Sequence, residues 1–252
     1  MLTAPRHITL IAAHRGGAGL RPENSRAAFT CAIALGVDQI ETDVRLTRDG
    51  EPVLIHDGTL ERTTSGGGAV AHRSWAELRR IRLRGANGET IPHLDELLSV
   101  LRMTSMGLRL ELKADQLQDG YSSLCARVIR SLRDHQILDR TTVSSFNWRS
   151  LIIFRALARP QGLIGLVKRD QYRQLGLNGI LALARDHELH EISLHPSQFS
   201  DGAIDLAAAQ DTRLGLYKVQ SPDEIECALR ARVSAFTTDH PDLAVEIRSG
   251  LP

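Results

Sequence analysis

The chain has 252 residues, of which 42% are hydrophobic and 24% are charged, and this size and composition indicate a globular protein. Its 31 Lys and Arg residues nearly balance its 30 Asp and Glu residues, which leaves a formal net charge of +1. No overall field therefore draws the protein to nucleic acid or to an anionic membrane, and any recognition of phosphate should be local.

Two further features bear on the compartment in which the protein works. No segment approaches the roughly 18 continuous apolar residues of a membrane span, and the N-terminus has no long apolar stretch followed by a cleavage site. Cys31, Cys125 and Cys227 lack metal-ligand spacing, so we expect buried free thiols. The sequence therefore predicts a soluble, cytoplasmic protein without a membrane span.

Nine β-like runs alternate with helical runs, which is typical of an α/β fold with a mainly parallel sheet. The linker between the second and third runs is too short for a parallel crossover, but it suits a hairpin turn at Asp49 and Gly50. The third run should therefore be antiparallel, which leaves eight parallel strands for a (β/α)8 barrel. The nine runs cover residues 8–14, 39–44, 52–57, 108–113, 141–146, 162–167, 191–195, 214–219 and 234–239.

Apolar residues at helical spacing predict seven helices, and Asn147, Ser200 and Ser221 are candidate N-caps. No linker divides the chain. One irregular stretch extends from Gly58 to about Pro92, with a glycine run and a short helix candidate from about Trp75 to Ile81. A connection of that length usually covers or lines a site. The predicted helices cover residues 23–36, 94–103, 121–135, 148–158, 179–188, 201–211 and 221–231.

Charged residues collect at the strand ends, where a (β/α)8 barrel carries its reactive groups. Glu41 and Asp43 are two positions apart in a strand, so both side chains should project from one face. Paired carboxylates of this kind suit a hard divalent cation, although a solvated acidic strand end would give the same pattern. Glu111 and Lys113 repeat the spacing at another strand end, where Glu111 can complete a three-carboxylate metal site. A structural ion pair is the alternative for these two residues.

Two histidines supply the remaining chemistry of a phosphodiester-cleaving site. Such cleavage needs charge neutralisation on the phosphate oxygens, a deprotonated nucleophile and a protonated leaving group. A metal with Arg15 and Lys113 can meet the first need, and His14 with His56 the other two, since imidazole titrates near neutrality. The sequence leaves open which histidine is the acid.

The other histidines lack a converging partner in the sequence, so we expect surface or capping roles for most of them. His195 differs because it ends a strand and can line the mouth of the barrel. The remaining six are His72, His93, His135, His187, His190 and His240.

Ordered short motifs at the strand ends resemble those of the glycerophosphodiester phosphodiesterase family. The likeness extends over about residues 10 to 245, and so many motifs in the same order are more specific than any one of them. The motifs are His14-Arg15-Gly16, Pro22-Glu23-Asn24, Glu41-x-Asp43, Thr47-x-Asp49-Gly50, His56-Asp57, Arg62-Thr63-Thr64, Ile91-Pro92, Glu111-x-Lys113, Ser144-Ser145-Phe146 and Thr238-Asp239.

This resemblance implies a single TIM-barrel domain over residues 1–252, with a β-hairpin and a small cap of about residues 57–92 inserted after strand 2. It also implies one divalent cation, Mg²⁺ or Ca²⁺, held by Glu41, Asp43 and Glu111. His14 and His56 match the family's general acid/base pair.

The substrate contacts implied by the resemblance match the family at some positions and differ from it at others. Arg15 and Lys113 match positions that hold phosphate in the family. Tyr217 keeps the aromatic wall of the family's Trp-Thr-Val-Asn segment, but Lys218 and Gln220 alter its polarity. These differences concern the part of the site that meets the alcohol group of the substrate.

The implied reaction is hydrolysis of a small-molecule glycerophosphodiester to glycerol 3-phosphate and an alcohol, with a neighbouring glycerol hydroxyl able to attack before water. Two other functions are compatible with the sequence. A related phospholipase D type would act on lysophospholipids or sphingolipids and would need an apolar channel, for which Trp75, Leu78 and Ile81 are candidates. A non-catalytic barrel that binds phosphate ligands is the third. The head group, the metal and the oligomeric state do not follow from the sequence.

Overall fold

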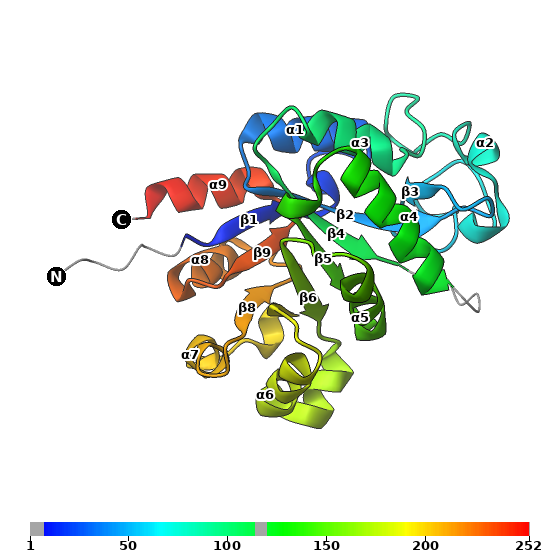
Figure 1. Ribbon diagram of the computed structural model, residues 1–252. Coiled ribbons are helices and arrows are strands. Elements are labelled where there is room, and N and C mark those ends of the chain that lie inside the picture. The colour runs from blue at the N-terminus through cyan, green and yellow to red at the C-terminus, as the bar shows by residue number, and fades with distance from the viewer. Residues whose placement is uncertain (1–7, 114–119, 252) are drawn as a thin grey trace.

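Eight parallel strands close into a barrel in the computed structural model, which describes residues 8–113 and 120–251 (Figure 1). β1 pairs with β9 on one side and with β2 on the other, which closes the ring. The predicted (β/α)8 barrel is therefore confirmed. Its parallel strands are β1 (Leu10–Ala13), β2 (Gln39–Leu46), β4 (Gly107–Leu112), β5 (Thr141–Ser145), β6 (Gly162–Leu166), β7 (Glu191–Leu194), β8 (Arg213–Leu216) and β9 (Ala235–Thr238).

The predicted hairpin is also present. β3 (Pro52–Leu54) runs antiparallel to β2, with Val44 opposite Leu54. The turn between them closes with a hydrogen bond from Gly50 N to Thr47 O of 3.0 Å, and Gly50 has the positive φ of 79° that such a turn favours. The hairpin returns the chain toward the end of β2, because Ile55 N donates to Asp43 O at 3.1 Å.

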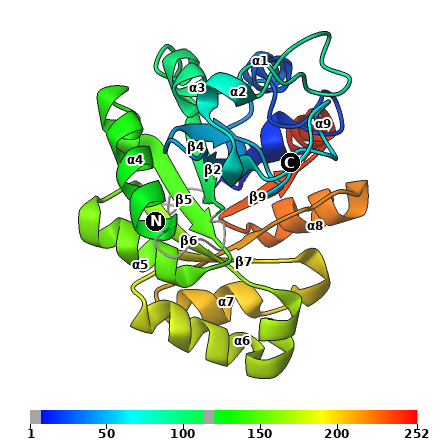
Figure 2. The same cartoon turned by 90° about the vertical axis from the view of Figure 1, so that its right-hand side faces the viewer.

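Helices surround the barrel and bury their apolar faces against its strands (Figure 2). In α3, for example, Leu94, Leu98 and Leu101 are fully buried, and His93 caps the N-terminus together with Glu96. None of the described helices is long and apolar enough to cross a membrane. The surrounding helices are α1 (Arg26–Leu35), α3 (Leu94–Leu101), α4 (Gly120–Asp134), α5 (Trp148–Leu157), α6 (Arg169–Asp186), α7 (Ala203–Ala208), α8 (Pro222–Ala231) and α9 (Pro241–Gly250). Short 3-10 turns are η1 (His14–Gly16), η2 (Val70–His72), η3 (Leu138–Arg140) and η4 (Pro196–Gln198).

Several helix boundaries differ from the prediction. α9 was not predicted, although Pro241 at its first turn is a usual helix start. α6 begins at Arg169 rather than at 179, and Gly176, with φ 62°, interrupts it, which breaks the helical periodicity of the sequence there. Asn147 and Ser221 cap their helices as predicted, whereas α7 starts after Gly202 and not at Ser200.

The three cysteines are free, as expected, but they are not all buried. Cys125 is fully buried, Cys31 is partly exposed and Cys227 is exposed. The prediction of buried thiols is therefore right for Cys125 and wrong for Cys227, because Cys227 lies on the outer face of an amphipathic helix.

The segment between β3 and α3 builds, together with Val53 of β3, a second, smaller hydrophobic cluster apart from the barrel core. Its short helix α2 (Trp75–Leu78) starts at a Ser74 capping box and is shorter than the predicted helix. Glu89 docks the segment on the barrel, since its carboxylate accepts the backbone N–H groups of Arg26 and Ala27 at 2.8 and 3.2 Å. We interpret this segment as a small cap inserted in one domain. The cluster comprises Val53, Ile55, Leu60, Val70, Leu78, Leu83, Ala86 and Ile91.

A charged pair lies inside the barrel. Arg109 of β4 and Glu191 of β7 are both nearly inaccessible to water and form an ion pair. Ser234 donates a second hydrogen bond of 2.7 Å to the Glu191 carboxylate. The cost of removing both charges from water offsets much of the attraction in such a pair. If one partner is lost, however, the other charge stays buried with neither a partner nor water.

We expect Arg109→Met to lower the free energy of unfolding by about 3–5 kcal/mol, because it leaves the Glu191 carboxylate buried and unpaired. The double variant Arg109→Leu with Glu191→Leu should regain most of that loss. Urea denaturation followed by circular dichroism measures both, with the exposed Arg159→Ala as control. Equal stability of Arg109→Met and the wild type would contradict the expectation.

Candidate active site

A cavity of about 280 Å³ opens among the strand ends and the loops that follow them. Seven of the eight predicted site residues line it, and Asp43, the eighth, lies fully buried beside them. The structure thus gathers the whole predicted set at one place. The cavity is lined by His14, Arg15, Glu41, His56, Arg109, Glu111, Lys113, Ser144, Phe146, Leu166, Tyr217, Lys218 and Thr237.

A tight turn after β1 presents His14 to the cavity. Arg15 and Gly16 have positive φ values of 52° and 82°, and such a conformation costs free energy for the non-glycine residue Arg15. Glycine is required at 16 for a second reason, since a Cβ there would lie 2.8 Å from the Cβ of Ala28. The turn also directs Arg15 N to the Glu41 carboxylate at 2.9 Å.

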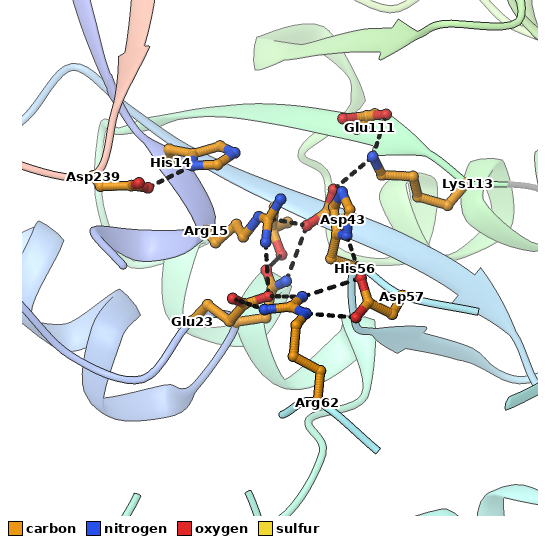
Figure 3. Close-up of polar contacts among 12 residues, drawn as sticks. His14, Arg15, Glu23, Asp43, His56, Asp57, Arg62, Glu111, Lys113 and Asp239 are labelled. Atoms are coloured by element: carbon orange, nitrogen blue, oxygen red, sulfur yellow. Dashed lines mark hydrogen bonds and ion pairs between the residues drawn. The ribbon is translucent and has the colours of Figure 1, made fainter. Parts of the chain in front are cut away.

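The imidazole of His14 is held by an aspartate from the last strand of the barrel. His14 Nδ1 donates to Asp239 Oδ1 at 2.5 Å, which leaves Nε2 for the cavity (Figure 3). Burial disfavours the protonated ring, but the hydrogen bond to Asp239 and the charge of Glu41 outweigh it, so the pKa of His14 is raised.

His56 has a parallel arrangement with the opposite electrostatic result. Its Nδ1 donates to Asp57 Oδ1 at 2.6 Å, and its side chain is 31% exposed. Burial lowers the pKa of His56, and Lys113 and Arg15 add to this effect against the opposing charge of Asp43. Arg45 Nε donates to the His56 carbonyl at 2.9 Å and so fixes the backbone at this point.

The three predicted metal-site carboxylates meet because of the strand register. Asp43 on β2 lies opposite Glu111 on the neighbouring strand β4, and Glu41 lies on the same face of β2. Carboxylate oxygens of the three residues lie within 4.8 Å of one another, and all three residues are buried. Such a set of hard oxygen donors fits a divalent cation.

The electrostatics of the carboxylates also fit a cation. Burial and the neighbouring acids raise the pKa of Glu111 to about 7 despite Lys113, and burial beside Asp43 raises the pKa of Glu41. Burial alone would raise the pKa of Asp43, but the charges of Lys113 and Arg15 outweigh this effect and hold its pKa at about 2. Asp43 Oδ1 is buried and accepts no hydrogen bond, although Lys113 Nζ lies 3.3 Å away. A buried oxygen without a hydrogen bond beside two further carboxylates is the donor that a metal ion would complete.

Arg15 and Lys113, the two residues that the sequence predicts to hold phosphate, flank the carboxylates. Lys113 Nζ lies 2.5 Å from Glu111 Oε1, and Arg15 Nη1 donates to Glu23 Oε1 at 2.8 Å. Arg15 Nε is buried and makes no hydrogen bond, although Asp43 Oδ2 is 3.5 Å away. Both cations line the cavity and therefore can meet an anionic group placed there.

Tyr217, which the sequence predicts as an aromatic wall of the site, lines the cavity. Its hydroxyl donates to Val167 O at 2.9 Å, so the ring and not the hydroxyl is offered to the cavity. Phe146 packs edge-on against it at 5.4 Å between ring centroids, and His195 packs against it at 5.7 Å. His195 itself is not among the described residues that line the cavity; it caps η4 and receives a contact from Arg169.

The sequence indicates the two histidines but not the acids that hold them. Asp239 and Asp57 stand in motifs that were recognised, yet neither was assigned to a histidine. Asn24, which donates to Asp43 Oδ2 at 3.0 Å, was likewise not assigned a partner. His56 and Asp57 are adjacent in the sequence, and this adjacency is a local signal for their pairing. His14 and Asp239 are 225 positions apart, so no local pattern could have indicated that pair.

The apolar channel suggested for a lipid substrate is not formed by the residues proposed. Leu78 is fully buried within the hydrophobic cluster of the cap, and Trp75 and Ile81 pack against that cluster. None of the three is among the described residues that line the cavity. Leu78 thus lies in the interior of the cap and the partly buried Trp75 and Ile81 cover its cluster, so these residues do not form an apolar wall of this cavity.

Comparison with known proteins agrees with this geometry. The sequence profile of the glycerophosphoryl diester phosphodiesterase family matches residues 14–243. The glycerophosphodiester phosphodiesterase of Caldanaerobacter subterraneus is 31% identical over 95% of this chain and 97% of its own. That of Bacillus altitudinis is 33% identical over 96% of this chain and 98% of its own.

Solved structures agree as well. A protein from Agrobacterium tumefaciens with the same family name superposes with a TM-score of 0.92, at 30% identity over 96% of this chain and 98% of its own. A phosphodiesterase from Oleispira antarctica, solved with its product sn-glycerol-3-phosphate, superposes with a TM-score of 0.80, at 25% identity over 96% of both chains. The chain therefore belongs to the glycerophosphoryl diester phosphodiesterase family and is a phosphodiester hydrolase.

Proposed function

We propose that this protein is a metal-dependent enzyme that cleaves glycerophosphodiesters to glycerol 3-phosphate and an alcohol. The observation that carries the proposal is the pair of aspartate-held imidazoles that line one cavity together with two of three clustered carboxylates. The product complex of the Oleispira antarctica relative supports the glycerol 3-phosphate half of the substrate.

The two histidines divide the proton transfers. His56, whose pKa is lowered, is neutral near pH 7 and accepts the proton of the attacking water or glycerol hydroxyl. His14, whose pKa is raised, is the better proton donor of the two and gives a proton to the departing alcohol oxygen as the phosphorus–oxygen bond breaks. Asp57 and Asp239 keep both rings in the tautomer that directs Nε2 to the substrate.

Glu41, Asp43 and Glu111 would hold one divalent cation, Mg²⁺ or Ca²⁺. When bound, that cation neutralises negative charge on the phosphate oxygens. Arg15 and Lys113 supply further positive charge and hold the phosphate in place beside the two imidazoles.

The alcohol of the substrate would lie against Tyr217 and Phe146. These rings with Leu166 give an apolar wall, and Lys218 adds a cation at its edge. A small water-soluble diester therefore suits the cavity better than a lysophospholipid, whose acyl chain would need the channel that the cap residues do not form. We further propose the cytoplasm as the compartment, which the free cysteines support.

We expect His14→Ala and His56→Ala each to lower kcat by at least about 100-fold on glycerophosphoglycerol, because each removes a proton-transfer group. A p-nitrophenyl diester has a leaving group that needs no proton. On this substrate, His14→Ala should lower kcat much less, whereas His56→Ala should lower kcat as much as it does on glycerophosphoglycerol. His240→Ala is a control outside the cavity lining. Wild-type turnover in both variants would overturn the proposal, and the reverse pattern of losses would exchange the two roles.

We expect removal of divalent cations by a chelator to abolish turnover, and Mg²⁺ or Ca²⁺ to restore it. Glu111→Gln should weaken binding of both ions at least about tenfold in calorimetry, because it removes an anionic ligand but keeps the side-chain shape. Glu226→Gln, on the exposed face of α8, is the matched control. Equal ion affinity of Glu111→Gln and the wild type would exclude the cluster as the metal site.

Metal affinity should also depend on pH through Glu111. Its pKa of about 7 in the metal-free protein means that a proton must leave before the carboxylate can bind an ion. Affinity should therefore fall about tenfold per pH unit below 7 and level off above it. Calorimetry at pH 6 and pH 8 measures the slope, which should flatten in Glu111→Gln. A wild-type affinity that does not change between these pH values would contradict the expectation.

A further inference from the structure

The guanidinium of Arg62, in the cap, joins two carboxylates of the site. Its Nε and Nη2 donate to Asp57 at 2.5 and 3.1 Å, and its Nη1 and Nη2 donate to Glu23 at 2.6 and 2.9 Å (Figure 3). Both contacts are bidentate, the arrangement that fixes a planar guanidinium against a carboxylate most precisely in angle.

Each of these carboxylates also accepts a hydrogen bond from a residue that lines the cavity. In both cases the accepting oxygen is one of the two that Arg62 contacts. Asp57 Oδ1 accepts from His56 Nδ1 at 2.6 Å, and Glu23 Oε1 accepts from Arg15 Nη1 at 2.8 Å. Arg62 itself is not among the described residues that line the cavity. It therefore reaches the site only through its two partners.

Both partners are charged at neutral pH. The Arg62 guanidinium holds the pKa of Asp57 well below its usual range. Burial alone would raise the pKa of Glu23, but hydrogen bonds from Arg62 and Arg15 lower it overall. Two negative carboxylates facing one another need a cation between them, and Arg62 is that cation.

The cap has other means of attachment, so Arg62 is not needed to hold it in place. Glu89 binds the N-terminus of α1, Arg26 Nη1 of α1 donates to Thr90 O of the cap at 2.9 Å, and the cap has its own hydrophobic cluster. The Arg62 side chain is 48% exposed, and half-exposed ion pairs contribute little to stability. The Arg62 contact therefore contributes little to the stability of the fold and mainly fixes the orientation of the two carboxylates.

We propose that Arg62 is a positioning residue that orients His56 and Arg15 together, through Asp57 and Glu23. The cap thereby sets the direction of one proton-transfer group and one phosphate ligand at the same time. This inference rests on the function proposed above for His56 and Arg15. Loss of Arg62 would free both carboxylates to rotate and would leave His56 and Arg15 without fixed partners.

The experiment compares Arg62→Ala, Arg62→Lys and the control Arg79→Ala, whose side chain makes no hydrogen bond or ion pair with the described residues. We expect Arg62→Ala to lower kcat/KM by about 10- to 100-fold with little change in Tm. Arg62→Lys should recover only part, because an ammonium cannot span two carboxylates bidentately. Guanidinium ion, far below denaturing concentrations, should raise the activity of Arg62→Ala and leave Arg79→Ala unchanged.

Variants of the two partners separate a positioning role from a structural one. Asp57→Asn should lower mainly kcat, through His56, and Glu23→Gln should raise mainly KM, through Arg15. Either change made in Arg62→Ala should cost much less than in the wild type, because the contact is already lost. Full additivity, or wild-type activity in Arg62→Ala, would overturn the inference. If the wild type itself cleaves no glycerophosphodiester, the proposed function fails instead.

Discussion

Mutual repulsion of three buried carboxylates is the constraint around which this site is built. Glu41, Asp43 and Glu111 lie close enough to share one ligand, and water is too scarce there to screen them. Lys113 and Arg15 balance part of their charge, which keeps Asp43 ionised, whereas burial and the neighbouring acids raise the pKa of Glu111 to about 7. A divalent cation would complete the balance, so the same charge distribution that favours metal binding also prepares the site for a phosphate.

Closure of the barrel gives one of the two histidines its partner. β9, the last strand, pairs with β1, the first, and this pairing places Asp239 beside His14. His56 obtains Asp57 from its own hairpin. Because one ring faces Glu41 and the other lies near two cations, similar contacts shift the two pKa values in opposite directions. Opposite shifts are what a pair of acid and base requires near neutral pH.

Polar contacts extend the site beyond the residues that meet the substrate. Arg62 connects the cap to His56 and Arg15 through two carboxylates. At the inner end of the cavity, Arg109 reaches into the barrel and pairs with Glu191. The rim and the floor of the site are thus both held by arginine–carboxylate pairs, whose planar geometry gives direction as well as charge.

The sequence by itself determined the barrel, the hairpin and the residue types of the site. Alternating strand and helix patterns repeat along the chain, and the i, i+2 spacing of Glu41 and Asp43 is a local property. Only the tertiary structure decided that Asp43 faces Glu111, that Asp239 holds His14 and that the apolar residues of the cap turn inward. Those facts depend on strand register and barrel closure, which join residues far apart in the chain and leave no local pattern.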